Sequence, residues 1–178
     1  MEGEITRARL SKPQTRVSTA LRLLLISVSW VALQIGSGYA THRMPLSWFT
    51  SDAWLYRLRR WERDGETYQR VFRIRRWKDL LPEAGAMFAG GVSKKRLGSR
   101  SRESLLRFIA ETRRAELTHW LPILLSVSFF AWNPPEVALW MPLFGLIVNL
   151  PFIAVQRYIR PRLRKLSGEF SSAPGPGP

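Results

Sequence analysis

Cysteine is absent from the 178-residue chain, and histidine occurs only twice. Without a thiol the protein cannot form a disulfide, offer a thiolate ligand to a metal or run covalent catalysis through a cysteine thioester. The chain also lacks the G-x-S-x-G motif of a serine nucleophile and the H-E-x-x-H motif of a zinc hydrolase. It contains one Glu-x-x-His pair in its helical pattern, whereas a carboxylate-bridged metal centre needs two. We therefore expect no metal and no bound cofactor.

Acidic residues are scarce, because 13 Asp and Glu stand against 28 Lys and Arg, which gives a formal net charge of +15. Such an excess predicts an anionic partner. Nucleic acid is one candidate, but basic residues that flank apolar runs are explained first by anionic lipid headgroups and by the positive-inside rule. We expect membrane lipids as the partner and no nucleic acid.

Ionisable residues are missing from two long apolar runs, 23–40 and 137–155. Each is close to the roughly 20 residues that a membrane-spanning helix requires. A third run, 121–132, is shorter, but it spans if its helix includes His119 and then turns at 133–135 into the next run. The sequence therefore predicts an all-α integral membrane protein with about three transmembrane helices: one near the N-terminus, followed by a helical hairpin.

These patterns divide the chain into five segments. They are a basic N-terminal tail (1–22), a first transmembrane helix (23–40), a basic membrane-surface region (41–118), a transmembrane helical hairpin (119–156), and a basic interfacial segment with a disordered Pro/Gly-rich tail (157–178). A signal peptide is an alternative interpretation of the first two segments. We prefer a span, because the basic tail is long and the apolar run approaches spanning length.

The distribution of basic residues predicts the orientation. The positive-inside rule places the basic loop and the C-terminus in the cytoplasm of a multi-pass protein of the cell membrane. The same orientation puts the basic N-terminus outside, against the rule, unless the first apolar run is re-entrant. Of these two arrangements, we prefer three full spans.

Three features are expected in the membrane-surface region. The stretch 48–61 would place Trp54 and Trp61 on one helical face and most arginines elsewhere, the pattern of an interfacial amphipathic helix. The stretch 67–77 alternates apolar and basic residues as a short strand does. A glycine-containing basic surface loop, 77–97, then ends near three successive cations. That loop could hold a phosphate, although a solvated loop explains the same composition.

Ionisable residues crowd against the start of an apolar run in the stretch 111–120, ETRRAELTHW. On a helix, Glu116 and His119 share one face. A neutral imidazole can take a proton from a hydroxyl, and Glu116 could orient that imidazole. A hairpin turning between two adjacent prolines brings Asn149 level with His119, where its amide could donate to a developing oxyanion. We predict these three residues as catalytic. The structural alternative is a charged collar whose polar residues only join the helices.

Cations at the same depth and in the basic loop suit a phosphorylated or carboxylated group. The predicted substrate-binding residues are Arg113, Arg114, Arg157, Gln156, Lys94 and Lys95. With a histidine base, this set suits acyl transfer to a hydroxyl of a lipid-embedded acceptor. The alternative function is a non-enzymatic lipid-binding or scaffold protein whose Arg and Trp residues only seat it in the bilayer.

Several motif blocks occur in a fixed order between about Trp61 and Leu166. They are Trp77-Lys78-x-x-LPEAG, Ser93-Lys94-Lys95-Arg96-Leu97, ETRRAE-x-x-HW, Asn149-x-Pro151-x-Ile153, Gln156-Arg157-Tyr158 and Arg160-Pro161-Arg162-Leu163. This order resembles the glycosyl-4,4'-diaponeurosporenoate acyltransferase family of staphyloxanthin-type carotenoid biosynthesis.

The resemblance implies a reaction but assigns no catalytic residue. That reaction is transfer of a fatty acyl group, with acyl-CoA as co-substrate, to a sugar hydroxyl of a glycosylated carotenoid or a related glycolipid. A chain of 20.6 kDa has little interior in which to bury two substrates, so a homodimer is compatible with this reaction.

Overall fold

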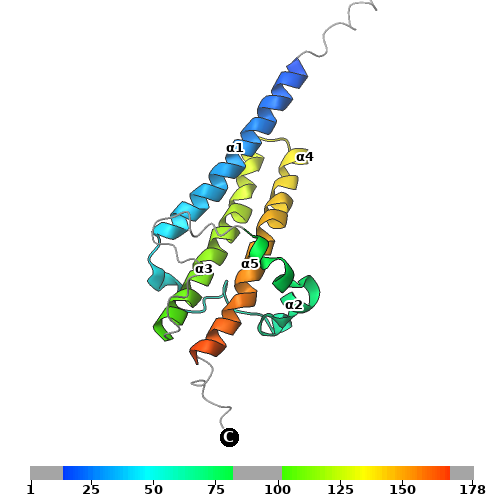
Figure 1. Ribbon diagram of the computed structural model, residues 1–178. Coiled ribbons are helices and arrows are strands. Elements are labelled where there is room, and N and C mark those ends of the chain that lie inside the picture. The colour runs from blue at the N-terminus through cyan, green and yellow to red at the C-terminus, as the bar shows by residue number, and fades with distance from the viewer. Residues whose placement is uncertain (1–13, 82–101, 169–178) are drawn as a thin grey trace, which may run out of the picture.

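The computed structural model describes residues 14–81 and 102–168, and every regular element in these ranges is helical (Figure 1). The elements are α1 (Gln14–Arg43), η1 (Leu46–Phe49), η2 (Arg60–Gly65), α2 (Glu66–Phe72), η3 (Ile74–Arg76), η4 (Lys78–Leu80), α3 (Arg102–Leu125), η6 (Ser126–Ala131), α4 (Pro135–Ala138) and α5 (Trp140–Ser167). The η elements are 3-10 helices. The prediction of an all-α fold is confirmed for the described residues.

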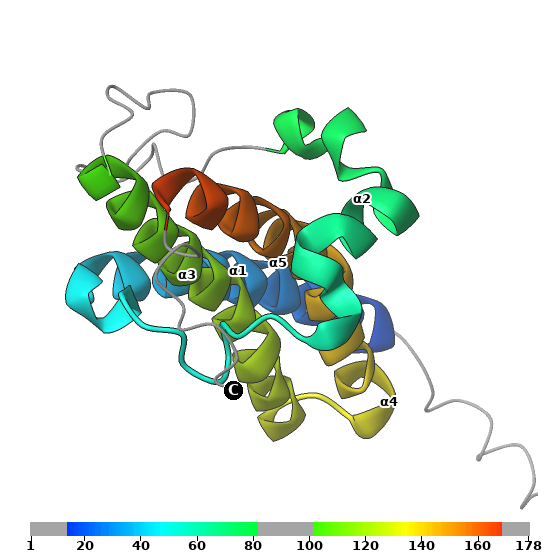
Figure 2. The ribbon, with the colours of Figure 1, turned by 90° about the horizontal axis from the view of Figure 1, so that it is seen from below.

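Three long helices form the body of the molecule (Figures 1 and 2). Helices α3 and α5 are antiparallel neighbours, and α1 packs along α3. The short elements between α1 and α3 gather at one end, where η1 lies against α3, and η2 and α2 lie against α5, whereas η6 and α4 lie at the opposite end (Figure 1). The molecule therefore has an apolar half, made mainly of the long helices, and a charged half, in which the membrane-surface region packs around α3 and α5.

A tight turn between η6 and α5 closes the predicted hairpin. Nδ2 of Asn133 donates to the Phe129 carbonyl at 3.1 Å. Pro134 is extended, and Pro135 opens α4 at a position where the missing N–H costs nothing. The turn lies at 133–135, as predicted.

Two predicted boundaries differ from the structure. Helix α1 begins at Gln14, inside the predicted basic tail, and α5 continues without a break to Ser167, where Gly168 ends it in the left-handed conformation at φ 72°. The segment predicted to start at 157 is therefore part of α5 as far as Ser167. Its arginines at 157 and 160 are buried against carboxylates, and an interfacial position of the segment stays a prediction.

Two helical stretches of the described chain are long and apolar enough to cross a membrane, Thr19–Arg43 and Pro135–Ser167. Their most apolar windows are only 6% and 22% buried inside the protein. Such exposed apolar faces are unlike the core helix of a soluble domain. Helix α3 does not meet the same criterion, so the count of three spans stays a prediction.

One glycine sets how closely α1 approaches the hairpin. A Cβ on Gly145 would lie 2.9 Å from Cη2 of Trp30, closer than real Cβ contacts. The Trp30 ring packs between Phe129 and Phe144, with centroids 5.4 Å and 5.0 Å away. The absence of a side chain at 145 thus lets this indole fit between the helices.

The predicted amphipathic helix over 48–61 is wrong. A 3-10 turn ends at Phe49, the chain then runs irregularly, and η2 begins at Arg60. The physical reason lies in the backbone carbonyls of this stretch, which accept from buried arginines instead of from helical N–H groups. Trp54 remains on the surface at 74% exposure, but without a helix beneath it.

The predicted short strand over 67–77 is also wrong. Its residues form α2 and η3, separated by Arg73 in the left-handed conformation at φ 49°. An isolated strand has no neighbour to pair with. Helical turns satisfy the backbone locally, while Ile74 is buried against α5 beside Tyr158.

Candidate active site

His119 on α3 and Asn149 on α5 form the centre of a polar cluster between the long helices. Nδ1 of His119 lies 3.0 Å from Oδ1 of Asn149. Nδ2 of Asn149 donates to the Gly145 carbonyl at 2.9 Å, and Nε2 of Gln34 on α1 donates to Oδ1 at 3.2 Å. The predicted hairpin register, with Asn149 level with His119, is confirmed.

The contacts of Asn149 define the tautomer of the neutral imidazole. A backbone carbonyl can only accept, so the amide nitrogen of Asn149 faces Gly145 and its oxygen faces His119. Because that oxygen also accepts, Nδ1 of His119 carries the proton and the ring's lone pair lies on Nε2. Phe152 stacks on the ring at a centroid distance of 4.4 Å and an angle of 15°. The ring is thus held with Nε2 as its basic atom.

Helix α1 contributes to this cluster, although the sequence prediction names none of its residues. Besides the Gln34 contact, Oγ1 of Thr41 lies 2.6 Å from Oγ1 of Thr118, the neighbour of His119. One signal could have pointed to Gln34. It is a polar amide inside an apolar run, where such a side chain is costly unless it finds a partner.

Glu116 is fully buried, and both of its carboxylate oxygens are bound by guanidinium groups. Oε1 accepts from Nε of Arg157 at 2.7 Å, and Oε2 accepts from Nη2 of Arg160 at 2.5 Å. Nε1 of Trp120 also donates to Oε1 at 3.3 Å. The group positioned on Nδ1 of His119 is Asn149, not this carboxylate. An orienting role of Glu116 for His119 therefore stays a prediction.

A second buried carboxylate, Glu62, extends the network into the surface region. Its oxygens accept from Nη1 of Arg157 at 3.1 Å and 3.2 Å and from the Tyr68 hydroxyl at 2.5 Å, and the Arg59 backbone N–H also donates to it. The remaining nitrogen of Arg157 donates to the Leu55 carbonyl at 2.5 Å. Burial, followed by the hydrogen bond and charge of Glu62, raises the pKa of Tyr68 well above its usual range. This phenol therefore stays neutral.

Arg160 is the second guanidinium that ties the surface region to the hairpin. It is fully buried; Nε donates to the Thr112 hydroxyl at 3.0 Å, and Nη1 donates to the Tyr56 carbonyl at 2.9 Å. Neither Arg160 nor Glu62 was predicted as a site residue. The sequence marks arginines and glutamates in this chain but not which of them are buried together.

Asp52 joins two further arginines at the edge of the network. Arg113 contacts it through Nε at 3.0 Å and Nη2 at 2.8 Å, and Arg164 binds its other oxygen. Burial raises the pKa of Asp52, but the hydrogen bond and charge of Arg164, together with Arg113, outweigh burial and leave that pKa below its usual value. Arg113 also donates to the Phe49 and Thr50 carbonyls.

The predicted substrate-binding residues lie in three kinds of surroundings. Arg113 and Arg157 are under 10% exposed and paired with carboxylates. Arg114 pairs with Glu111 one turn away at 2.6 Å. Gln156 is buried, and its Oε1 has no hydrogen-bond partner among the described residues. Lys94 and Lys95 lie outside the described residues. Binding of substrate by any of these side chains stays a prediction.

The fold and site define a small helical protein with two candidate membrane-spanning helices, a buried arginine–carboxylate network and, beside it, a histidine that contacts the amide of Asn149. A family model described as glycosyl-4,4'-diaponeurosporenoate acyltransferase matches residues 52–169. The chain is 35% identical over 141 residues to a protein of that name from Staphylococcus haemolyticus, covering 79% of this chain and 81% of the relative. It is 29% identical over 140 residues to one from Staphylococcus aureus, covering 79% and 84%.

These matches place the chain in the glycosyl-4,4'-diaponeurosporenoate acyltransferase family, and it is an enzyme of the acyltransferase class. The matched range contains the whole buried network, His119 and Asn149, whereas α1 precedes it. No solved structure matches the chain.

Proposed function

We propose that this enzyme transfers a fatty acyl group from acyl-CoA to a sugar hydroxyl of a glycosylated carotenoid or a related glycolipid in the membrane. The family supports the class of reaction and the acceptor, since the relatives are named for a glycosylated carotenoid carboxylate. The observation that carries the site is the His119–Asn149 hydrogen bond, which presents Nε2 as a base. The apolar helices around that histidine support an acceptor held in lipid.

In the proposed mechanism His119 acts as the general base. Nε2 takes the proton of the sugar hydroxyl while the hydroxyl oxygen attacks the carbonyl carbon of the thioester. The tetrahedral intermediate then collapses, the carbon–sulfur bond breaks, and the CoA thiolate leaves and takes the proton back from the imidazolium. Asn149 stabilises that imidazolium by accepting from Nδ1. An additional role for Asn149 as oxyanion donor requires its amide nitrogen to leave the Gly145 carbonyl, to which it donates.

We further propose a multi-pass arrangement in the cell membrane, with the charged half of the molecule at the cytoplasmic surface. The exposed leucines and valines of α1 and the exposed apolar residues of α5 support contact with lipid. The start of α3 and the end of α5 both lie in the charged half (Figure 1). A cytoplasmic position of this half would give acyl-CoA, a polar thioester, direct access to the site.

Replacing His119 by Ala tests the proposal. Lipids from cells that express the wild-type enzyme should contain an acceptor shifted by the mass of a fatty acyl chain, and H119A should lose that species by about 100-fold or more, the usual contribution of a general base. His42→Ala is the matched control, since it removes the chain's other histidine from the last turn of α1. Undiminished product from H119A at equal protein level refutes His119 as the base. No mass shift with the wild-type enzyme, in cells that contain the glycosylated acceptor, contradicts this acceptor.

A further inference from the structure

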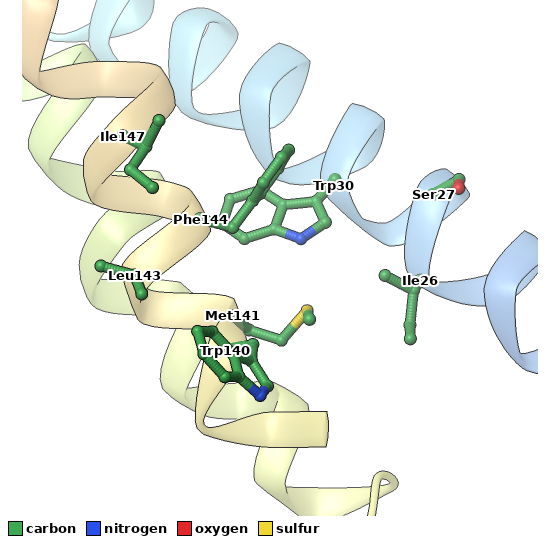
Figure 3. Close-up of a pocket in the computed structure, with 8 residues that line it drawn as sticks. All are labelled: Ile26, Ser27, Trp30, Trp140, Met141, Leu143, Phe144 and Ile147. Atoms are coloured by element: carbon green, nitrogen blue, oxygen red, sulfur yellow. The ribbon is translucent and has the colours of Figure 1, made fainter. Parts of the chain in front are cut away.

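An apolar groove of about 640 Å³ opens between α1 and the first part of α5 (Figure 3). Ile26 and Trp30 line it from α1, and Trp140, Phe144 and Ile147 line it from α5. Its volume is in the range of small-molecule sites. The groove lies in the apolar half of the molecule, away from the buried arginines.

The groove ends next to the His119 cluster. Gln34 follows Trp30 by one turn of α1, and Asn149 follows Ile147 on α5 and donates to the Gly145 carbonyl. One helical turn of four residues rises about 6 Å. The apolar groove and Asn149, which contacts the proposed base, are therefore about one helical turn apart along α1 and about half a turn apart along α5.

One polar atom in the groove has no partner. Nε1 of Trp30 is buried and makes no hydrogen bond with any described residue. Trp30 as a whole is 8% exposed. In Figure 3 this nitrogen points into the groove, toward the side where Met141 and Ile26 lie. An unpaired buried N–H is costly, and indole N–H groups usually find an acceptor. Met141 has a flexible side chain that can move aside for a ligand.

We propose that this groove binds the apolar chain of the acceptor, a glycosyl ester of a carotenoid acid, and that the Trp30 N–H donates to its ester carbonyl. The proposal rests on the proposed function and adds the position of the acceptor. Trp30 is a substrate-binding residue and Gly145 makes room for its ring. The carotenoid chain runs along the groove into the bilayer, and the sugar lies on the side of His119.

Spacing favours the acceptor over the acyl donor as the occupant. The donor's thioester carbonyl is the reacting group, so it must come within about 3–3.5 Å of the hydroxyl oxygen that His119 activates. Trp30 precedes Gln34, which contacts Asn149, by about 6 Å along α1, so a carbonyl held by Trp30 lies about a helical turn from the His119–Asn149 pair. The acceptor's ester carbonyl does not react, and the sugar ring separates it from the hydroxyl that does.

Replacing Trp30 by Phe removes the N–H and keeps an aromatic ring between Phe129 and Phe144. Two acceptors are compared with acyl-CoA as donor: the glycosyl ester of the carotenoid acid, and an ether-linked alkyl glycoside without an ester carbonyl. For the ester, KM should rise about two- to tenfold in W30F, the effect of one hydrogen bond. Values of kcat, the KM of acyl-CoA and the KM of the ether should stay within twofold. Trp48→Phe, at an exposed indole outside the groove, is the matched control.

Binding without turnover separates this proposal from the proposed function. The purified enzyme in detergent is mixed with the glycosyl ester in the absence of acyl-CoA, and co-elution of polyene absorbance with the protein gives Kd. Weaker binding by W30F supports the groove even if no transfer occurs, in which case the proposed function alone fails. A higher KM for acyl-CoA in W30F, or equal Kd of W30F and wild type for the ester, overturns the assignment of the groove.

Discussion

Arg160 and Glu116 are both fully buried, and Nη2 of the arginine lies 2.5 Å from Oε2 of the glutamate. The same carboxylate binds Arg157, and the two guanidinium groups together hold the carbonyls of Leu55 and Tyr56. A single glutamate on α3 therefore connects α5 with the irregular surface segment. It lies on the same helix three residues before His119, the proposed base.

Replacing Glu116 by Gln should reduce the free energy of unfolding by about 3–5 kcal/mol, because two buried guanidinium groups lose their shared counter-charge. The measurement is thermal or denaturant unfolding in detergent, with each variant at the same protein concentration. Glu111→Gln is the matched control on the same helix, because Glu111 is partly exposed and pairs with Arg114 within one turn. That change should cost less, because it removes the partner of one arginine instead of the shared partner of two. Equal losses for the two variants would contradict a structural role for the buried network.

Asp52→Asn should remove part of the protein's acid sensitivity. The pKa of Asp52 in the folded protein lies below its ordinary value of 3.8, so the charged carboxylate adds stability above that value. This contribution is lost as the pH falls from about 5 through the folded-state pKa. The variant should be about 1–2 kcal/mol less stable at pH 7, with a smaller further loss between pH 5 and pH 3 than the wild type.

Unfolding curves of both proteins across this range measure the acid effect. Asp79→Asn is the control, because Asp79 is mostly exposed and, among the described residues, pairs with its neighbour Lys78. It should change neither stability nor pH dependence appreciably. If Asp52→Asn had the same slope with pH as the wild type, the carboxylate between Arg113 and Arg164 would not be the acid-sensitive group.

The hairpin could be predicted because its signals are local. Adjacent prolines specify the turn, and the position of that turn sets the register that brings His119 level with Asn149. The surface region could not be predicted in this way. Its irregular path depends on carbonyls that accept hydrogen bonds from buried arginines of α3 and α5, and these arginines are 63 to 104 positions away in sequence. Helical periodicity in 48–61 carried no information about those distant donors.

The same contrast between local signals and contacts distant in sequence explains which site residues could be predicted. His119 stands out because histidine is rare in the chain, whereas Glu62 is one acid among many charged residues and gains its role only by burial against Arg157. The predicted cations were chosen for charge and depth, but sequence does not reveal that Arg113 already has a carboxylate partner.

Replacing Asn149 by Leu should separate positioning of the base from stability of the hairpin. Leu has a similar shape but cannot accept from Nδ1 of His119 or from Gln34, so the imidazole loses its fixed tautomer and orientation. We expect kcat to fall about ten- to 100-fold, as for a misplaced catalytic group, while KM for the glycosylated acceptor changes little. Asn133→Leu is the matched control, because Asn133 is also buried but its side chain, within the described ranges, bonds the turn carbonyl of Phe129 and not the proposed base.

Asn133→Leu should lower thermal stability and leave kcat of the folded fraction close to that of the wild type. Asn149→Asp adds a second arm: its carboxylate still accepts from Nδ1, so a larger share of kcat should return than in Asn149→Leu. If the Leu and Asp variants lost kcat equally, or if Asn133→Leu lost as much as Asn149→Leu, acceptance from His119 would not be what Asn149 contributes. Recovery of kcat in Asn149→Asp but not in Asn149→Leu would show that Asn149 keeps the proton on Nδ1 of His119 and the lone pair on Nε2.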